Sequence, residues 1–387
     1  MSILRLLGSI LSIGLLAAAP PEPGTRAWVL VLDQRGAVVG DLKPEEFQVK
    51  VDGKPQKPVR VKTPGETADA SQSWILVFEP IRDTSMRALA FTAAADFLTR
   101  VPEGDRVMIV SRGKDSLESL MPGLSTRRGL WAEALAKVPE LLPEAFLGVS
   151  KETLQGSGFR AGYADGPDGP AGQEALNALL ARFKAAPSGW AGGTTDQRGV
   201  NVLDRINLNS PGVVAGMIGA ATREAKALGW LMDQLSQVSG QKHLIVFSRC
   251  EADDLSHPNV KRAMNQPFKR ERGDMGGPAE AAALATRDMT LLQAELKARA
   301  IAAGITLYSV AGAGQNVMGH VGSIAPATGG YAFPLTAGLE AQFGQGIQVF
   351  GSRYALEWQE GRAPGTALPL DVSTSRKGLK VLAQNHW

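Results

Sequence analysis

The chain has 387 residues, of which 44% are hydrophobic and 20% charged. This length and composition exclude an intrinsically disordered chain and leave room for two or three folded units. The 41 basic and 38 acidic residues give a formal net charge of +3, so bulk charge identifies no partner. The most basic stretch, Lys261 to Arg272, holds a single aromatic residue, Phe268, and such a stretch does not predict nucleic-acid binding.

Residues 1–19 have the pattern of a secretory signal peptide. Met1 to Arg5 carries one positive charge, and an uncharged run from Leu6 to Ala19 ends in three alanines. The run is shorter than a membrane-spanning helix requires, and a buried N-terminal helix is the alternative interpretation. We therefore expect an exported protein, periplasmic or extracellular, with no stable membrane span once the signal is removed.

The chain contains one cysteine, Cys250. No cysteine follows the apolar run at a position where a lipid could attach, and one thiol cannot form a disulfide within the chain. We expect the exported fold to be stabilised by its hydrophobic core alone.

Residues 26–62 and 351–387 both have the pattern of antiparallel strands. In the first segment, Trp28 to Leu32 reads as a strand, Leu42 to Phe47 as a short helical step, and Phe47 to Val51 as a strand that meets the hairpin signal Asp52-Gly53. The second segment holds three further strands: Tyr354 to Trp358, Leu368 to Thr374 and Lys380 to Leu382. We expect the two segments to form one small antiparallel β-module, separated from the rest by a linker at 63–73.

Residues 74–350 alternate between buried strands and amphipathic helices. Trp74 to Phe78 and Arg106 to Val110 are strand-length apolar runs on either side of a predicted helix, Ser85 to Arg100. Two later units repeat the pattern, with predicted helices at 220–238 and 279–303 and predicted strands at 243–247 and 305–310. The alternation predicts an α/β fold: a doubly wound, mostly parallel sheet with helices on both faces.

An irregular insertion is expected near residues 148–219, where glycine and asparagine are frequent. Only Glu174 to Ala185 reads as a helix there. Long insertions of this kind in a compact domain are usually functional or mobile. We expect this insertion to lie over one end of the sheet, where binding loops gather.

The order of these segments resembles that of the von Willebrand factor A-related proteins of acidobacteria. The resemblance covers nearly the whole chain after the predicted signal. The residues that carry it are Val31 to Gly36, Gly40 to Leu42, Glu46 with Phe47, Val51 to Gly53, Pro102 to Val107, Gly240 to Ser248, Ala325 to Gly330, Phe333 and Tyr354. It implies a von Willebrand factor A-like fold for residues 74–350 and the binding of a protein ligand.

The resemblance also implies a metal-ion adhesion site, and this chain departs from its pattern. The wider superfamily holds magnesium or calcium with Asp-x-Ser-x-Ser after the first strand, a threonine on a second loop and an aspartate after the fourth strand. Here Glu79 takes the leading position, while Ile81 and Asp83 take the serine positions, and Arg249 stands after the fourth predicted strand. We expect Arg249 to pair with Glu79 or Asp83 and replace the ion.

Two alternatives to this metal-free site remain open. Arg249 could point to solvent beside a degenerate site, or a metal could be retained on Asp83, Thr84 and Ser85 with one threonine of the insertion. The complete set of predicted binding residues lies at the carboxyl ends of the parallel strands. It comprises Glu79, Arg82, Asp83, Thr84, Ser85, Thr194, Thr195, Arg249 and Asp253.

No catalytic, metal or cofactor site is predicted. The four histidines have no zinc-ligand spacing, and the glycine-rich stretch Val310 to Gly314 lacks the third glycine and the acidic partner of a dinucleotide loop. We therefore expect a non-enzymatic, adhesion-type protein that binds a protein ligand and no nucleic acid. The alternatives are a structural subunit of an exported assembly, whose β-module adds strands to a neighbour, and a hydrolase that uses the insertion as its lid. The oligomeric state stays open.

Overall fold

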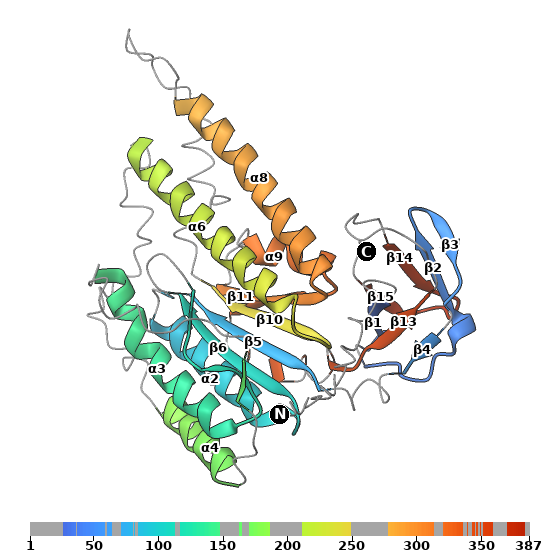
Figure 1. Cartoon of the computed structure of the whole chain (residues 1–387), viewed down its shortest axis with the longest axis horizontal. Helices are drawn as coiled ribbons and strands as arrows, with labels where there is room; N and C mark the ends of the chain where they lie inside the picture. Colours follow the sequence, from blue (N-terminus) through green and yellow to red (C-terminus); the bar gives the residue numbers. More distant parts are fainter. Residues whose placement is uncertain are drawn as a thin grey trace, which may run out of the picture.

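The computed structural model describes residues 26–35, 37–58, 60–63, 71–79, 81, 84–112, 117–147, 162–164, 170–185, 211–248, 278–312, 320–335, 339, 343–344, 346, 349, 351–358 and 370–383. These residues form a mixed α/β protein with a mostly parallel sheet, helices on both of its faces, and two smaller antiparallel sheets (Figure 1). The α/β class expected from the sequence is thus confirmed. The predicted signal peptide, the basic stretch 261–272 and Cys250 lie outside the described residues.

The large sheet has the strand order of a doubly wound fold. Its five parallel strands follow the order β12-β11-β10-β5-β6, and β7, β8 and β9 extend it beyond β6. The chain leaves β5 towards β6 but leaves β10 towards β11, so the winding direction reverses between β5 and β10. The strands are β5 (Ser73–Phe78), β6 (Arg106–Arg112), β7 (Leu117–Ser119), β8 (Gly123–Ser125), β9 (Gly162–Ala164), β10 (Lys242–Phe247), β11 (Ile305–Gly312) and β12 (Tyr331–Leu335).

Helices cover both faces of this sheet, as its continuous apolar strands require. One face packs against α2 (Thr84–Arg100), α3 (Arg128–Leu147) and α4 (Pro170–Ala185). The other packs against α6 (Pro211–Leu235), α8 (Pro278–Ala302) and α9 (His320–Ile324), as Figure 1 shows for α6 and α8. No helix among the described residues has the length and apolarity needed to cross a bilayer.

Helix α6 begins well before the expected residue 220. Residues 211–219 belong to the expected irregular insertion, and Gly212, Gly216 and Gly219 lower helix propensity there. Pro211 stands at the first helical position, where proline is favoured, and the buried residues of α6 from Ala225 onward pack against the sheet. The insertion expected at 148–219 therefore ends in helix.

The described parts of the insertion extend the side of the sheet. Strand β9 pairs with β8 in parallel, and α4 packs on α2 and α3. Leu176, Leu179 and Phe183 of α4 are buried, and the ring of Phe183 lies 5.7 Å from that of Phe91 on α2. The expectation that the insertion covers an end of the sheet is therefore not met by residues 162–164 and 170–185, since β9 is a strand of the sheet and the apolar side chains of α4 join the core.

The two antiparallel sheets draw strands from both ends of the chain. Strand β1 pairs with β13 on one side and β15 on the other, while β14 pairs with β2. The sheet orders are β15-β1-β13-β4 and β14-β2-β3. The strands are β1 (Arg26–Leu32), β2 (Phe47–Val51), β3 (Lys54–Gln56), β4 (Arg60–Lys62), β13 (Tyr354–Glu357), β14 (Leu370–Thr374) and β15 (Lys380–Ala383). We call these seven strands the β-module.

The predicted hairpin signal forms the turn between β2 and β3. Asp52 and Gly53 both have positive φ, 51° and 72°, as a turn that follows the twist of paired strands requires. The expected helical step is a short 3₁₀ helix, Pro44–Glu46. Local sequence signals thus placed both features of the N-terminal half.

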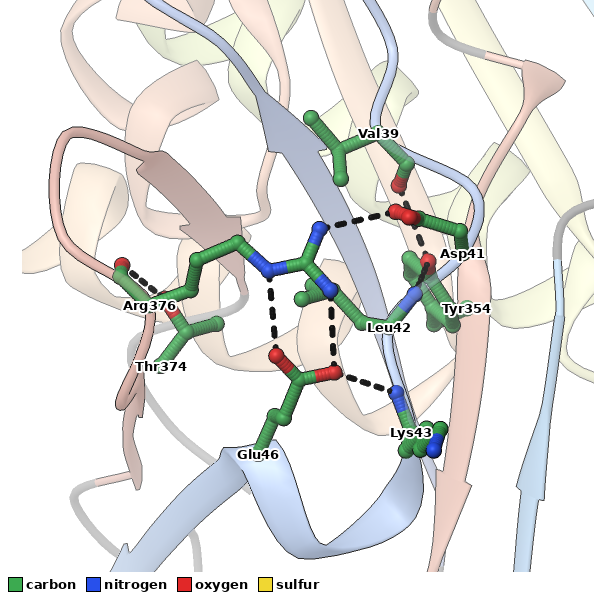
Figure 2. Close-up of polar contacts among 8 residues, drawn as sticks. All are labelled: Val39, Asp41, Leu42, Lys43, Glu46, Tyr354, Thr374 and Arg376. Carbon is green, nitrogen blue, oxygen red and sulfur yellow. Dashed lines mark hydrogen bonds and ion pairs between the residues drawn. The ribbon is translucent and has the colours of Figure 1, made fainter.

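Polar contacts join the two halves of the β-module at one corner (Figure 2). The hydroxyl of Tyr354 accepts a hydrogen bond from the backbone N–H of Leu42 at 2.8 Å and donates one to the carbonyl of Val39 at 2.9 Å. Nearby, the guanidinium of Arg376 binds both carboxylate oxygens of Glu46, at 3.0 and 3.1 Å. The backbone N–H of Lys43 and then Arg376 hold the pKa of Glu46 below its usual value.

Strand β1 contributes to two hydrophobic cores. Val29 and Val31 point into the core between the two antiparallel sheets. Leu30, on the opposite face of the strand, belongs to the same buried cluster as Trp74 and Phe78 of β5. The β-module is therefore packed against the large sheet through a shared apolar contact.

Candidate functional site

The carboxyl edge of the large sheet carries a buried carboxylate where the winding direction reverses. Glu79 follows the last residue of β5, and its backbone N–H donates to the carbonyl of Phe247 at the end of β10, at 2.9 Å. Its side chain is only 2% exposed. In open α/β sheets, ligands bind in the crevice at this point, so Glu79 is placed where the sequence predicted a binding residue.

A guanidinium from the neighbouring strand lies on this carboxylate. The last residue of β6 is Arg112, and its Nη1 lies 3.4 Å from Oε1 of Glu79 and 3.1 Å from Oε2 of Glu224 on α6. The three side chains are 7%, 2% and 17% exposed, in the order Arg112, Glu79, Glu224. We call this arrangement the arginine clamp.

The register of the sheet explains the clamp. Phe78 of β5 is paired with Ser111 of β6, so the next residues along the two strands are neighbours. Parallel neighbours point to the same face, which places Glu79 and Arg112 together beneath α6. Neither Arg112 nor Glu224 is among the binding residues predicted from the sequence. A charged residue directly after the apolar run of β6 was a visible signal for Arg112, but the position of Glu224 depends on how α6 crosses the sheet.

The segment after Glu79 is held by a second arginine. The Nε of Arg87, in the first turns of α2, donates to the carbonyl of Ile81 at 2.9 Å, and Ile81 is 1% exposed. Thr84 and Ser85 form the start of α2. The other predicted binding residues, Arg82, Asp83, Thr194, Thr195, Arg249 and Asp253, lie outside the described residues. The predicted pairing of Arg249 with Glu79 or Asp83 therefore stays a prediction.

Among the described residues of this edge, the Glu79 carboxylate is paired with Arg112 and is not left open for the divalent cation that the family resemblance implies. A cation would need the Glu79 carboxylate as its leading oxygen ligand, and that carboxylate is bound to a permanently charged guanidinium. Within the described part of the chain, no group of three or more His, Cys, Asp and Glu side chains is arranged to hold a metal.

At the amino edge of the same sheet, one arginine donates to a chain of uncharged hydrogen-bonding side chains. Arg353, which has no exposed surface, donates from Nη2 to the hydroxyl of Tyr308 at 3.0 Å and to the carbonyl of Gly329 at 2.7 Å. The Tyr308 hydroxyl lies 3.2 Å from Nδ1 of His243. Nε2 of His243 lies 3.0 Å from Oε1 of Gln72.

These contacts assign one direction to the hydrogen bonds. Because Nε2 of Gln72 donates to a carbonyl, its Oε1 accepts from Nε2 of His243, and Nδ1 of the neutral imidazole is then an acceptor. The hydroxyl of Tyr308 accepts from Arg353 and donates its own proton to this Nδ1. Neutral His243 then carries its proton on Nε2 and donates to Gln72, whose Nε2 donates to the carbonyl of Gly351 at 3.1 Å. We call this chain, which begins at Arg353 and ends two residues away at Gly351, the amino-edge relay.

Burial keeps the relay neutral. It holds the pKa of His243 well below its ordinary value, and the charge of Arg353 adds to the effect. The imidazole also stacks on Trp74, with ring centroids 3.9 Å apart. Burial raises the pKa of the neighbouring Asp105, which accepts from the backbone N–H of Gln72 at 2.9 Å and from the indole N–H of Trp74 at 2.8 Å. The relay fixes the segment around Gly351 and Arg353 against the amino ends of the strands, and its imidazole is shielded from solvent.

Comparison with known proteins gives likeness to solved structures only. No family model and no curated protein matches the chain. A von Willebrand factor type A protein from Catenulispora acidiphila is 11% identical, with 94% of this chain and 73% of that chain covered and a TM-score of 0.33. A point mutant of the PilB minor pilin from Streptococcus sanguinis is 11% identical, with 73% and 62% covered and a TM-score of 0.31.

A third similar structure is the human COPII-coat protein Sec24c, which is 10% identical, with 81% of this chain and 44% of that chain covered and a TM-score of 0.33. Structural neighbours therefore include a von Willebrand factor A structure, at low identity and low TM-score. The strand order of the large sheet, which is mostly parallel and reverses its winding between β5 and β10, is by itself compatible with such a fold.

Proposed function

We propose that this chain is an exported, non-enzymatic protein of the von Willebrand factor A-like type that binds a protein ligand at the carboxyl edge of its large sheet, without a metal. The observation that carries the proposal is the reversal of the winding direction between β5 and β10, the point where ligands bind in open α/β sheets. The arginine clamp lies buried directly beneath this edge and fixes the ends of β5 and β6 against α6. The N-terminal pattern of residues 1–19 supports export. Fold analogy supports the adhesion-type role.

The chemistry of the described residues favours binding over catalysis. The imidazole of His243 is completely buried and hydrogen-bonded within the protein, so it is not available to a substrate. The clamp pairs its carboxylates with a guanidinium, which is not an arrangement for a general acid or base. The hydrolase alternative would need catalytic groups from the insertion, and the assembly alternative would need strands added to the β-module.

Site-specific photo-crosslinking tests the docking edge. A photoreactive amino acid is introduced at Asp83 and at Ser248, which follow the carboxyl ends of β5 and β10, and at Glu103 in the turn before the amino end of β6. In the cells that produce the protein, the first two positions are expected to yield discrete crosslinked partners. The control at Glu103 is expected to yield none of them.

The same crosslinked species from Glu103, or none from either carboxyl-edge position, contradicts the proposed docking edge. Export is tested separately, by deleting residues 2–19 and locating the protein by cell fractionation. Retention of the deleted form in the cytoplasm, with a shortened N-terminus on the exported full chain, supports a cleaved signal. An exported chain that keeps residue 1 contradicts it.

A further inference from the structure

We infer that Arg112 is the resident cation of the carboxyl edge and takes the place of the divalent metal that this position of the fold would otherwise hold. The inference deepens the proposed function and rests on it for the use of this edge as a docking surface. It assigns the metal-free character to a residue of β6, which the family pattern does not include.

The geometry places the guanidinium on the acidic residue that corresponds to the leading metal ligand. Nη1 of Arg112 lies between the carboxylates of Glu79 and Glu224, at 3.4 and 3.1 Å, and comes from the strand next to β5. A guanidinium stays charged at any pH the fold survives, and it carries several donors that several carboxylate oxygens can share. The two glutamates are thus brought together by a covalently attached cation.

Electrostatic repulsion disfavours a metal ion that competes with Arg112 for Glu79. To reach Glu79, a divalent ion would have to displace Arg112, which is 7% exposed and would be left buried close to the ion. Like charges at that separation repel strongly in a poorly solvated site. Without Arg112, the same position would present two carboxylates and room for water, which is a donor set that magnesium, calcium and manganese accept.

The arginine that replaces the metal is thus Arg112, whereas Arg249 was expected from the sequence. Arg249 follows β10 and lies outside the described residues, whereas Arg112 is in direct contact with Glu79. The two assignments predict different variants: removing Arg112 opens the edge to a cation, while removing Arg249 leaves the edge closed because the arginine clamp is intact.

Metal titration of the purified full chain tests this assignment. The wild type, R112M, R249M and the double variant E79Q/R112M are titrated with MgCl₂, CaCl₂ and MnCl₂ while thermal unfolding and bound metal are followed. We expect the wild type and R249M to ignore all three ions. R112M is expected to bind a cation and to gain roughly 5 °C in Tm at about 100 times its Kd. The double variant, which lacks the Glu79 carboxylate, is expected to lose this gain.

Two results overturn the inference. One is a wild-type protein that binds a divalent ion in a manner abolished by Glu79→Gln. The other is a folded R112M, verified by circular dichroism, with no cation response. If R112M does not fold, the wild type alone provides the test. Mn²⁺ retained by the wild type at Glu79 then contradicts the inference, because a resident arginine excludes the ion from that carboxylate. The partner is absent from this titration, so its outcome is independent of the crosslinking result.

Discussion

The two edges of the large sheet use arginine in opposite ways. At the amino edge, Arg353 starts a chain of neutral hydrogen-bonding groups that returns to its own segment of the chain. At the carboxyl edge, Arg112 pairs with two carboxylates, Glu79 and Glu224. The amino edge therefore fixes the position of a segment through hydrogen bonds, whereas the carboxyl edge gathers charged groups beneath the loops that follow the strands. Variants at both edges separate the two roles.

The largest expected effect is the removal of the clamp cation. Arg112→Met leaves the buried Glu79 carboxylate without its guanidinium, so we expect a loss of about 3–5 kcal/mol in the free energy of unfolding near neutral pH. Urea unfolding near neutral pH measures this loss. A loss below about 1 kcal/mol would show that the contacts of Arg112 contribute no more to stability than an exposed ion pair does.

Breaking the amino-edge relay ranks next. His243→Leu keeps an apolar side chain against Trp74 but leaves the Tyr308 hydroxyl and Gln72 Oε1 without their buried partner. We expect a loss of about 2–4 kcal/mol, because the Tyr308 hydroxyl and Gln72 Oε1 each lose a hydrogen bond in a buried site. The matched control is Lys226→Leu on the exposed face of α6, which should change stability by less than about 0.5 kcal/mol. Equal losses of stability in both variants would show that the relay makes no specific contribution to stability.

The pH dependence of stability should carry the signature of His243. Its pKa is well below 6.5 in the folded protein and ordinary in the unfolded chain, so between these values the unfolded state binds more protons. The contribution is complete above about pH 6.5 and decreases as pH falls, by at most about 1.4 kcal/mol per pH unit. Chemical unfolding from pH 7.5 to 5 measures the slope. H243L should lack this component, and an unchanged slope in H243L assigns it to other groups.

A smaller effect is expected inside the β-module. Tyr354→Phe removes the hydroxyl that serves Leu42 N–H and the Val39 carbonyl, while the ring remains against Phe47 at 5.0 Å. We expect a loss of about 1–2 kcal/mol in unfolding free energy. Thermal unfolding of the full chain provides the measurement, and a neutral substitution would show that water replaces both hydrogen bonds.

The smallest effect is expected at the exposed Arg376 (Figure 2). Arg376→Ala removes its contacts with Glu46 and Asp41, but these are solvent-exposed ion pairs that salt screens. The Tm should fall less than in Tyr354→Phe, and the difference should disappear in high salt. A salt-independent loss would mean that Arg376 contributes by packing.

The sequence predicted those parts of the fold whose signal is local. The runs Trp74 to Phe78 and Leu244 to Phe247 are apolar throughout, and such a run predicts a strand that is buried on both faces. The turn Asp52-Gly53 carries its own conformational preference. Helix α3 was not anticipated, although its buried residues Trp131, Leu135 and Val138 fall at helical spacing. Helix α6 begins earlier than expected, at Pro211, because the glycines at its start give a weak local signal.

The candidate site was only partly predictable for a related reason. Glu79 was found because it directly follows a recognisable strand. Arg112 joins it through strand register, and Glu224 joins through the crossing of a helix over the sheet, so these contacts depend on positions that are distant in sequence. Neither contact has a motif of its own. The same holds for the relay, where Gln72, His243 and Arg353 come from three separate segments.

The pairing of the two chain ends sets an order of events in folding. The hydrogen bonds of Tyr354 with Leu42 and Val39 join residues 312 and 315 positions apart, so β1 and β2 leave the ribosome long before their partners exist. The relay contact between Gln72 and Gly351 lies where the chain enters and leaves the large sheet. Once the large sheet has folded, it holds both ends side by side and shortens the loop that the β-module must close. The β-module should therefore assemble after the large sheet, because β13, β14 and β15 follow the large sheet in the chain.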